Sequence, residues 1–126
     1  MVLGQLMRRL RVENTLPISH GAVLARLERE GPRTTSALAA AERMRPQSMS
    51  QTVAELGTAG LVARSPDPTD GRQILIGLTE QGQSTLADDR ARRDGWLAGA
   101  IEAELTPAEQ ETLLRAVAIL HRLAQS

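Results

Sequence analysis

The fold of this chain is decided by residues 46–82, which read PQSMSQTVAELGTAGLVARSPDPTDGRQILIGLTEQG. Met49, Val53 and Leu56 recur at helical spacing, and the run begins on a proline, which the first turn of a helix accepts. The run ends at a glycine, the usual residue just beyond the C-terminus of a helix. The sequence therefore predicts a helix over residues 46–59.

Beyond that glycine the apolar period changes from that of a helix to that of a strand. Residues 61–64 can form a first strand, and residues 73–78 place three apolar side chains, beginning with Ile74, on one half-buried face. Between them, residues 66–71 read PDPTDG and are rich in turn formers. We expect a β-hairpin with a long polar tip.

Three helical patterns precede this unit. Residues 2–12 carry an apolar stripe, and so do residues 19–30, for which Ser19 is the expected N-cap. A short helix should follow Thr34, another good N-cap residue. Together with the helix over 46–59, the short helix predicts a helix-turn-helix.

Two more helices follow the hairpin. Thr79 opens a long helical segment to about residue 104, and the capping box TPAE at 106–109 begins a last helix. The expected fold class is mainly α with a small β-hairpin wing: a winged helix-turn-helix with additional N- and C-terminal helices.

Composition excludes several classes of protein. The 126 residues are 41% hydrophobic and 24% charged, as expected for one globular domain of zero formal net charge. The absence of Cys excludes disulfide scaffolds, zinc ribbons and thiol chemistry. No apolar run is long enough for a membrane span, and the N-terminus lacks the apolar core of a signal peptide. We therefore expect a cytoplasmic protein without membrane contact.

A helix-turn-helix followed by a wing suits duplex DNA, because a helix fits the major groove and its N-terminal residues reach base edges. In the helix over 46–59, Gln47 and Gln51 can each pair with adenine. Ser48 and Ser50 can contact bases or phosphates. The alternative is a solvated helix face, where Ser and Gln are common, and the pattern alone leaves both interpretations open.

The segments around the hairpin carry a further pattern. At the turn, Asp70 and Arg72 form D-x-R, and after the second strand Leu78, Thr79 and Gly82 form L-T-x-x-G. This order resembles the wing signature of the MarR family of bacterial regulators. Other segments similar to that family are residues 34–39, 45–50 and 105–109. The first helix is shorter than in many members, and the lack of Cys excludes the thiol-oxidation sensing that some members use.

The resemblance implies a homodimer that binds a pseudo-palindromic operator, with one winged helix in each half-site. It divides a single MarR-type domain, residues 1–126, into a winged helix-turn-helix lobe at 19–80 and dimerisation helices at 1–14 and 84–126. The residues agree, since a short apolar first helix and a broad-faced apolar last helix both need a partner. The predicted interface residues are Leu3, Leu6, Leu10, Val117 and Leu120.

The resemblance also divides the DNA contacts between the wing and the helix-turn-helix. Arg72 would enter the minor groove, whose negative potential attracts a guanidinium, and Arg64 would lie near the phosphates. Asp70 would either hold Arg72 in place or only form the turn. The predicted DNA-binding residues are Gln47, Ser48, Ser50, Gln51, Arg72, Arg64, Thr34, Thr35, Ser36 and Arg45.

Trp96 is the only aromatic residue and allows two interpretations. It either anchors the dimer core, which we favour, or lines a pocket between the winged helix-turn-helix lobe and the dimerisation helices, where family members bind small aromatic acids. His20 and His121 are expected at the surface or in packing, and the pair Asp88 and Asp89 on a solvated helix face. No metal or cofactor is predicted.

The predicted function is a repressor that binds duplex DNA sequence-specifically and is relieved by a small aromatic or phenolic ligand. Such a ligand would change the spacing of the two recognition helices, provided that it binds the two spacings with different affinity. The alternative is a winged helix used for docking to proteins, which would need no Arg at the wing tip. An enzyme is not expected, because no G-x-S-x-G, P-loop or H-E-x-x-H motif provides catalytic residues.

Overall fold

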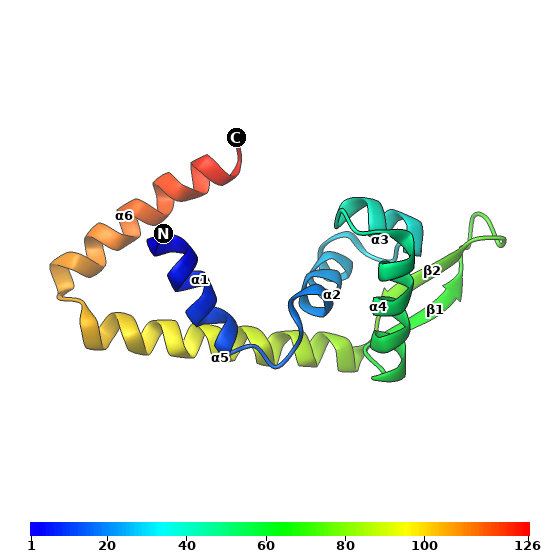
Figure 1. The fold of residues 1–126 in the computed structure, drawn as a ribbon, viewed down its shortest axis with the longest axis horizontal. Coiled ribbons are helices and arrows are strands. Elements are labelled where there is room, and N and C mark those ends of the chain that lie inside the picture. Colours follow the sequence, from blue (N-terminus) through cyan, green and yellow to red (C-terminus); the bar gives the residue numbers. More distant parts are fainter.

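The computed structural model describes residues 1–126 and consists of six helices and one β-hairpin (Figure 1). In chain order, the elements are α1 (Val2–Val12), α2 (Ile18–Glu30), α3 (Thr35–Ala41), α4 (Pro46–Thr58), β1 (Val62–Pro66), β2 (Ile74–Leu78), α5 (Glu80–Glu104) and α6 (Pro107–Ala124). The two strands are antiparallel, with Val62 opposite Leu78 and Pro66 opposite Ile74. The predicted mainly α fold with a small hairpin wing is confirmed.

Helix α5 is the long element along which the rest of the chain is arranged (Figure 1). Helix α2 packs against α5, next to α3, α4 and the hairpin, and we call the elements from α2 to β2 the winged lobe. Helix α1 also packs on α5, further from the wing, and α6 turns back from the C-terminal end of α5. None of the helices is at once long and apolar enough to cross a membrane.

The L-T-x-x-G motif forms the junction between the hairpin and α5. The Thr79 hydroxyl accepts a hydrogen bond from the Gly82 N–H at 2.9 Å and donates one to the Gly60 carbonyl at 2.7 Å. A Cβ on Gly82 would stand 2.1 Å from the carbonyl oxygen of Leu61, so only glycine fits there. Gly60 itself has a φ of 78°, which turns the chain out of α4.

The capping box at the start of α6 is also present. The Thr106 hydroxyl accepts from the Glu109 N–H at 3.2 Å, and the Glu109 carboxylate accepts from the Thr106 N–H at 2.9 Å. That second bond, from the backbone, is the main reason that the pKa of Glu109 is lowered. The helix therefore begins where the sequence predicted.

One apolar core lies in the winged lobe and the first turns of α5. Its buried members are Val23, Leu24, Leu27, Leu38, Ala39, Met49, Val53, Leu56, Leu61, Val62, Ile76 and Leu86. They include the three apolar residues from which the helix over 46–59 was predicted. By contrast, α1 and α6 contain no buried residue.

Two expectations about element boundaries are wrong in detail. Helix α2 begins at Ile18 with Pro17 at its N-cap, so Ser19 lies within the first turn and does not cap the helix. Strand β1 continues to Pro66 instead of ending at residue 64, because its outer residues stay paired with β2 up to the turn.

The hairpin is also less evenly buried than its alternating pattern suggested. Ile76 is fully buried, whereas Ile74 is 46% exposed, because the outer end of the hairpin projects beyond the helices (Figure 1). The buried end gains a further pairing that the sequence did not predict. Arg33, between α2 and α3, exchanges backbone hydrogen bonds of 3.0 and 2.7 Å with Ile76. This bridge attaches the wing to the helix-turn-helix.

Candidate nucleic-acid interface

A short turn with defined backbone geometry joins α3 to α4. Thr34 begins α3, since its hydroxyl accepts a hydrogen bond from the Ala37 N–H at 3.1 Å. Beyond the other end of α3, Arg43 adopts a positive φ of 54°, and the Met44 N–H returns to the Ala39 carbonyl at 2.9 Å. The turn therefore sets the direction in which α4 leaves α3.

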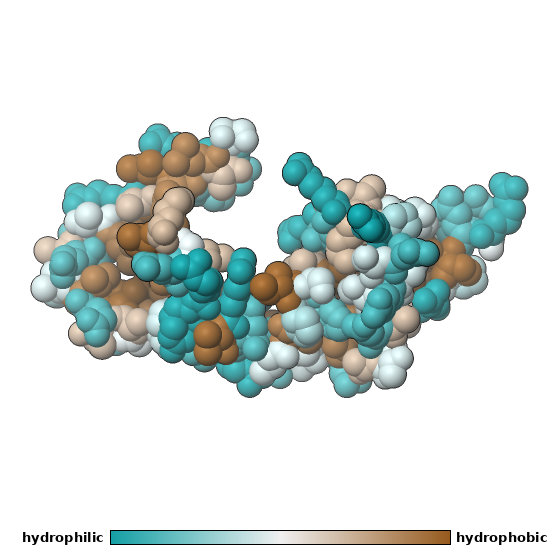
Figure 2. Space-filling view, viewed as in Figure 1, coloured by the Kyte–Doolittle hydropathy of each residue, from teal (hydrophilic) through white to brown (hydrophobic).

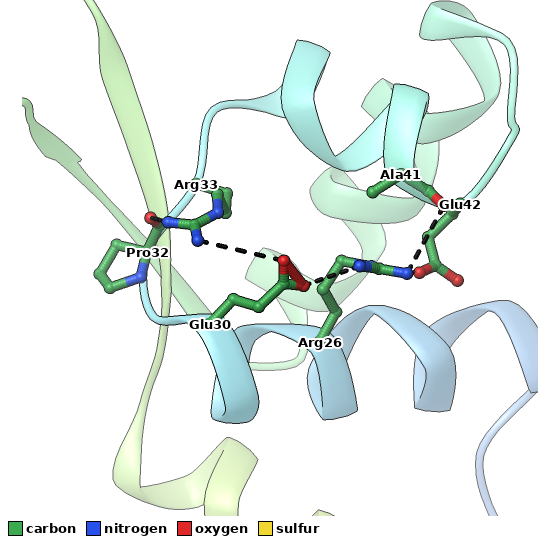
Figure 3. Close-up of polar contacts among 6 residues, drawn as sticks. All are labelled: Arg26, Glu30, Pro32, Arg33, Ala41 and Glu42. Atoms are coloured by element: carbon green, nitrogen blue, oxygen red, sulfur yellow. Dashed lines mark hydrogen bonds and ion pairs between the residues drawn. The ribbon is translucent and has the colours of Figure 1, made fainter. Parts of the chain in front are cut away.

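The side chain of Arg26 ties α2 to the end of α3 (Figure 3). Its Nη1 donates to Glu30 at 2.7 Å, its Nε donates to Glu42 and its Nη2 reaches the Ala41 carbonyl at 3.5 Å. Arg33 approaches Glu30 from the other side, at 4.0 Å. The hydrogen bonds to Glu42 and then Glu30 raise the pKa of Arg26, which is the direction expected for a guanidinium that pairs with carboxylates. This cluster links α2 to the end of α3.

The outward face of α4 is polar, as expected for a recognition helix. Gln47, Ser48, Ser50 and Gln51 all lie in its first two turns, and all four are exposed. Arg45, at the N-cap of α4, is exposed as well. These side chains occupy the N-terminal part of the helix, which in helix-turn-helix proteins reaches base edges.

Glu55 follows Gln51 by one turn and links α4 to α2. One carboxylate oxygen accepts a hydrogen bond from Nε2 of Gln51 at 3.2 Å, and the other lies 2.8 Å from Nε2 of His20. The His20 side chain is only 16% exposed, so this histidine belongs to the packing between α2 and α4. His121, on α6, is exposed.

Two aspartates organise the tip of the wing. Asp67 accepts hydrogen bonds from the N–H and the hydroxyl of Thr69, at 2.9 and 2.8 Å, which lower the pKa of its carboxyl. Asp70 accepts from the N–H of Arg72 at 3.1 Å and from its Nε at 3.3 Å. The Arg72 side chain is still 93% exposed, and Arg64 is exposed on β1, so both guanidinium groups face solvent.

The base of α3 and the wing meet at one place on the surface. Thr34, Thr35 and Ser36 line a shallow hollow together with Gln73 and Ile74 of the hairpin. Three of the predicted DNA-binding residues are therefore neighbours of the wing.

Helices α1 and α6 leave hydrophobic side chains uncovered. Figure 2 shows these residues in brown over α6. Of the predicted interface residues, Leu3 is 52%, Leu6 41%, Val117 51% and Leu120 44% exposed, and Leu10 is half-buried. Exposed apolar surface of this extent on a single chain is typical of an interaction site.

A cavity of about 290 Å³ lies where α1, α2 and α5 meet. Its walls combine apolar and charged side chains, among them Met7, Leu16, Leu86, Arg11, Arg90, Arg93 and Asp89. The side-chain oxygen of Asn14 is buried there without a hydrogen-bond partner. Trp96 does not line this cavity. The guanidinium carbon of Arg9 lies over its ring, 4.2 Å from the ring centroid.

The expectation of a solvated Asp89 is wrong, since this residue is only 4% exposed. Its carboxylate accepts hydrogen bonds from the N–H of Thr15 at 2.8 Å, from the Thr15 hydroxyl and from the N–H of Leu16 at 3.4 Å. Burial alone disfavours the charged form, but these bonds and the charge of Arg93 outweigh it and lower the pKa of Asp89. The donors come from the linker between α1 and α2, which the local charge pattern does not show.

Comparison with known proteins identifies the family. The sequence profile of the MarR family matches residues 14–73. An HTH-type transcriptional regulator of Mycobacterium bovis is 37% identical over 123 residues, which span 95% of this chain and 85% of the relative. The chain belongs to the MarR family.

Solved structures agree with this assignment. A transcriptional regulator from Pseudomonas aeruginosa is 37% identical, with a TM-score of 0.88 over 98% of this chain and 89% of that chain. A Staphylococcus aureus MepR variant bound to an oligodeoxyribonucleotide shares the fold at 19% identity, with a TM-score of 0.76 over 98% and 93% of the two chains. This chain is thus a MarR-family transcriptional regulator with a DNA-binding winged helix.

In this MarR-family chain, the residues that position the interface were not predicted from the sequence. Arg26 with Glu30, and Gln51 with Glu55, are four residues apart, so helical spacing could have suggested both contacts. Neither the bond from Arg26 to the end of α3 nor the pairing of Glu55 with His20 has a local signal. These contacts depend on how α2 packs against the helix-turn-helix.

Proposed function

We propose that this regulator is a repressor that binds a pseudo-palindromic duplex operator as a homodimer and is released by a small aromatic or phenolic ligand. The observation that carries the proposal is the exposed polar face at the start of α4, together with the solvent-exposed guanidinium of Arg72 on the wing. A cytoplasmic location follows from this role.

The proposed DNA contacts fall into two kinds. Gln47, Ser48, Ser50 and Gln51 would read base edges in the major groove, which admits a helix. Arg72 would enter the minor groove. Backbone contacts, which position the lobe without reading sequence, would come from Thr34, Thr35, Ser36, Arg45 and Arg64.

Dimerisation is supported by the uncovered faces of α1 and α6. A two-fold symmetric dimer would cover Leu3, Leu6, Leu10, Val117 and Leu120 with the same residues of a second copy. In this proposal the winged lobe, residues 19–80, binds DNA, and the segments 1–14 and 84–126 set the spacing of the two lobes. Trp96, on α5, belongs to this second part.

Ligand control is supported by the cavity between α1, α2 and α5. Its apolar walls suit a ring, and Arg11, Arg90 and Arg93 suit an acidic group on that ring. The cavity lies between the winged lobe and α1, so a ligand there can bias the spacing of the two lobes. It does so only if it binds one spacing more tightly than the other.

The first test compares two variants of the interface. Arg72→Ala removes a cation, so we expect weaker binding to operator and random duplex alike and a salt slope reduced by about one charge per subunit. Gln51→Ala removes base contacts without a charge and should cost about 1–3 kcal/mol per half-site on the preferred operator, with little change in slope. Affinities are measured by titration across a salt series.

The same experiment decides between the proposal and a protein-docking module. If Arg72→Ala binds duplex DNA with unchanged affinity and slope, the wing does not touch DNA, and docking to a protein becomes the better explanation. Selection of bound fragments from a randomised duplex library supplies the preferred operator.

A further inference from the structure

The side-chain amide of Gln51 has two different polar groups. Its oxygen only accepts hydrogen bonds, and its NH₂ group only donates them. The orientation of the amide therefore decides which base edge the residue can read. The neighbours of Gln51 on α4 and α2 bear on this choice.

Glu55 constrains the orientation of this amide. A carboxylate only accepts hydrogen bonds, so the group of Gln51 that lies 3.2 Å from Glu55 is the NH₂ group. One amino hydrogen is used in this bond. The amide oxygen and the second amino hydrogen remain for an outside partner.

His20 in turn holds the carboxylate. The second oxygen of Glu55 lies 2.8 Å from Nε2 of His20, which must donate because the carboxylate cannot. The Glu55 side chain is 49% exposed, whereas that of His20 is 16% exposed. The well-packed histidine on α2 therefore anchors a carboxylate that would otherwise be free to rotate in solvent.

We propose that Glu55, held by His20, orients the Gln51 amide so that it selects adenine over guanine at the base it contacts. Adenine offers an amino donor and the N7 acceptor, which match the free oxygen and the free amino hydrogen of Gln51. Guanine offers two acceptors. To donate both amino hydrogens to guanine, Gln51 would have to turn its oxygen toward Glu55, and the carboxylate repels it. Glu55 and His20 are thus positioning residues that set specificity.

This inference rests on the proposed function, and its test uses the full-length chain with a randomised duplex library. Wild type and Gln51→Ala are selected first, which identifies the position that Gln51 reads. Affinities are then measured for duplexes with adenine or guanine at that position. We expect wild type to prefer adenine by roughly tenfold or more.

Glu55→Gln keeps the size of the side chain but can donate to a flipped Gln51 oxygen. We expect it to lose most of the adenine preference at that one position, while affinity for random duplex is equal or higher because a negative charge is gone. His20→Ala should reduce the preference in part, and His20→Gln, which retains a donor near the same place, should restore it. Glu28→Gln also removes one negative charge, but Glu28 pairs with Arg90 of α5 at 2.6 Å, so this control should leave base preferences unchanged.

The outcomes separate the two proposals. If wild type selects no duplex sequence, the proposed function fails and the inference fails with it. If wild type selects an operator but shows no adenine preference where Gln51 acts, or if both Glu55→Gln and His20→Ala keep the wild-type preference, the inference alone is overturned. A change of preference at a different position from that of Gln51→Ala would also overturn it.

Discussion

In the winged lobe, helices and hairpin cover one another's apolar side chains, whereas α1 and α6 leave theirs in solvent. Leu24, Leu38 and Met49 are fully buried, while Leu3 and Val117 are more than half exposed. The lobe is therefore stabilised by its own apolar core. The exposed apolar side chains of α1 and α6 can contribute fully only when another surface covers them. In the proposed dimer, this division would let the winged lobe contact DNA while the terminal helices hold the two copies together.

The largest loss of stability is expected from a cavity in the winged lobe. Leu24→Ala removes a fully buried side chain, so we expect the free energy of unfolding to fall by about 2–5 kcal/mol. Urea denaturation measures it at several protein concentrations. The loss should be the same at each, whereas the effect of Leu120→Ala should vary with concentration, because it acts through association.

The second change addresses the uncovered face of α6 directly. Leu120→Asp places a charge on the proposed dimer interface and should weaken association about a hundredfold, or about 2.7 kcal/mol, giving monomers in light scattering at micromolar concentration. Ala118→Asp is the matched control, since two residues correspond to about 200° around a helix and Ala118 is exposed. Wild type that is already monomeric would contradict the dimer.

A third change tests the junction between the lobe and α5. In Gly82→Ala the new Cβ meets the Leu61 carbonyl, so we expect a loss of about 1–3 kcal/mol in thermal or chemical unfolding. Gly57→Ala, also in a helix but with no atom within 4 Å of its Cβ, should instead be neutral or stabilising by up to about 1 kcal/mol. Equal effects would show that the close approach at Gly82 is unimportant.

A comparable effect is expected at the carboxylate that joins α5 to the linker between α1 and α2. Because the pKa of Asp89 is lowered in the folded state, its contribution is present at neutral pH and disappears as the pH falls below about 4, through the folded-state pKa. Asp89→Asn should therefore cost about 1–3 kcal/mol at neutral pH, and this difference from wild type should vanish in acid. The exposed neighbour supplies the control, Asp88→Asn, which should change stability by less than about 0.5 kcal/mol.

Much of the secondary structure was predictable because its signals are local. The stripe of α4, the caps Thr34 and Thr79 and the capping box at the start of α6 each act within a few residues of chain. The exposure of the polar residues on α4 follows from the same helical periodicity. The end of strand β1 was less predictable, since pairing continued to Pro66, where the apolar alternation gives no signal.

The sequence by itself determined which segments are helices, where most of them begin and which family they belong to, because helical periodicity, caps and the D-x-R and L-T-x-x-G motifs are all contained in short stretches of chain. Only the tertiary structure decided which charged residues are buried and what they hold. Asp89 reaches a linker more than seventy residues away, and His20 reaches Glu55 across 35 residues. A charge run looks the same in sequence whether it faces water or a row of backbone donors. The desolvation of a carboxylate and the hydrogen bonds that offset it exist only once the helices have packed.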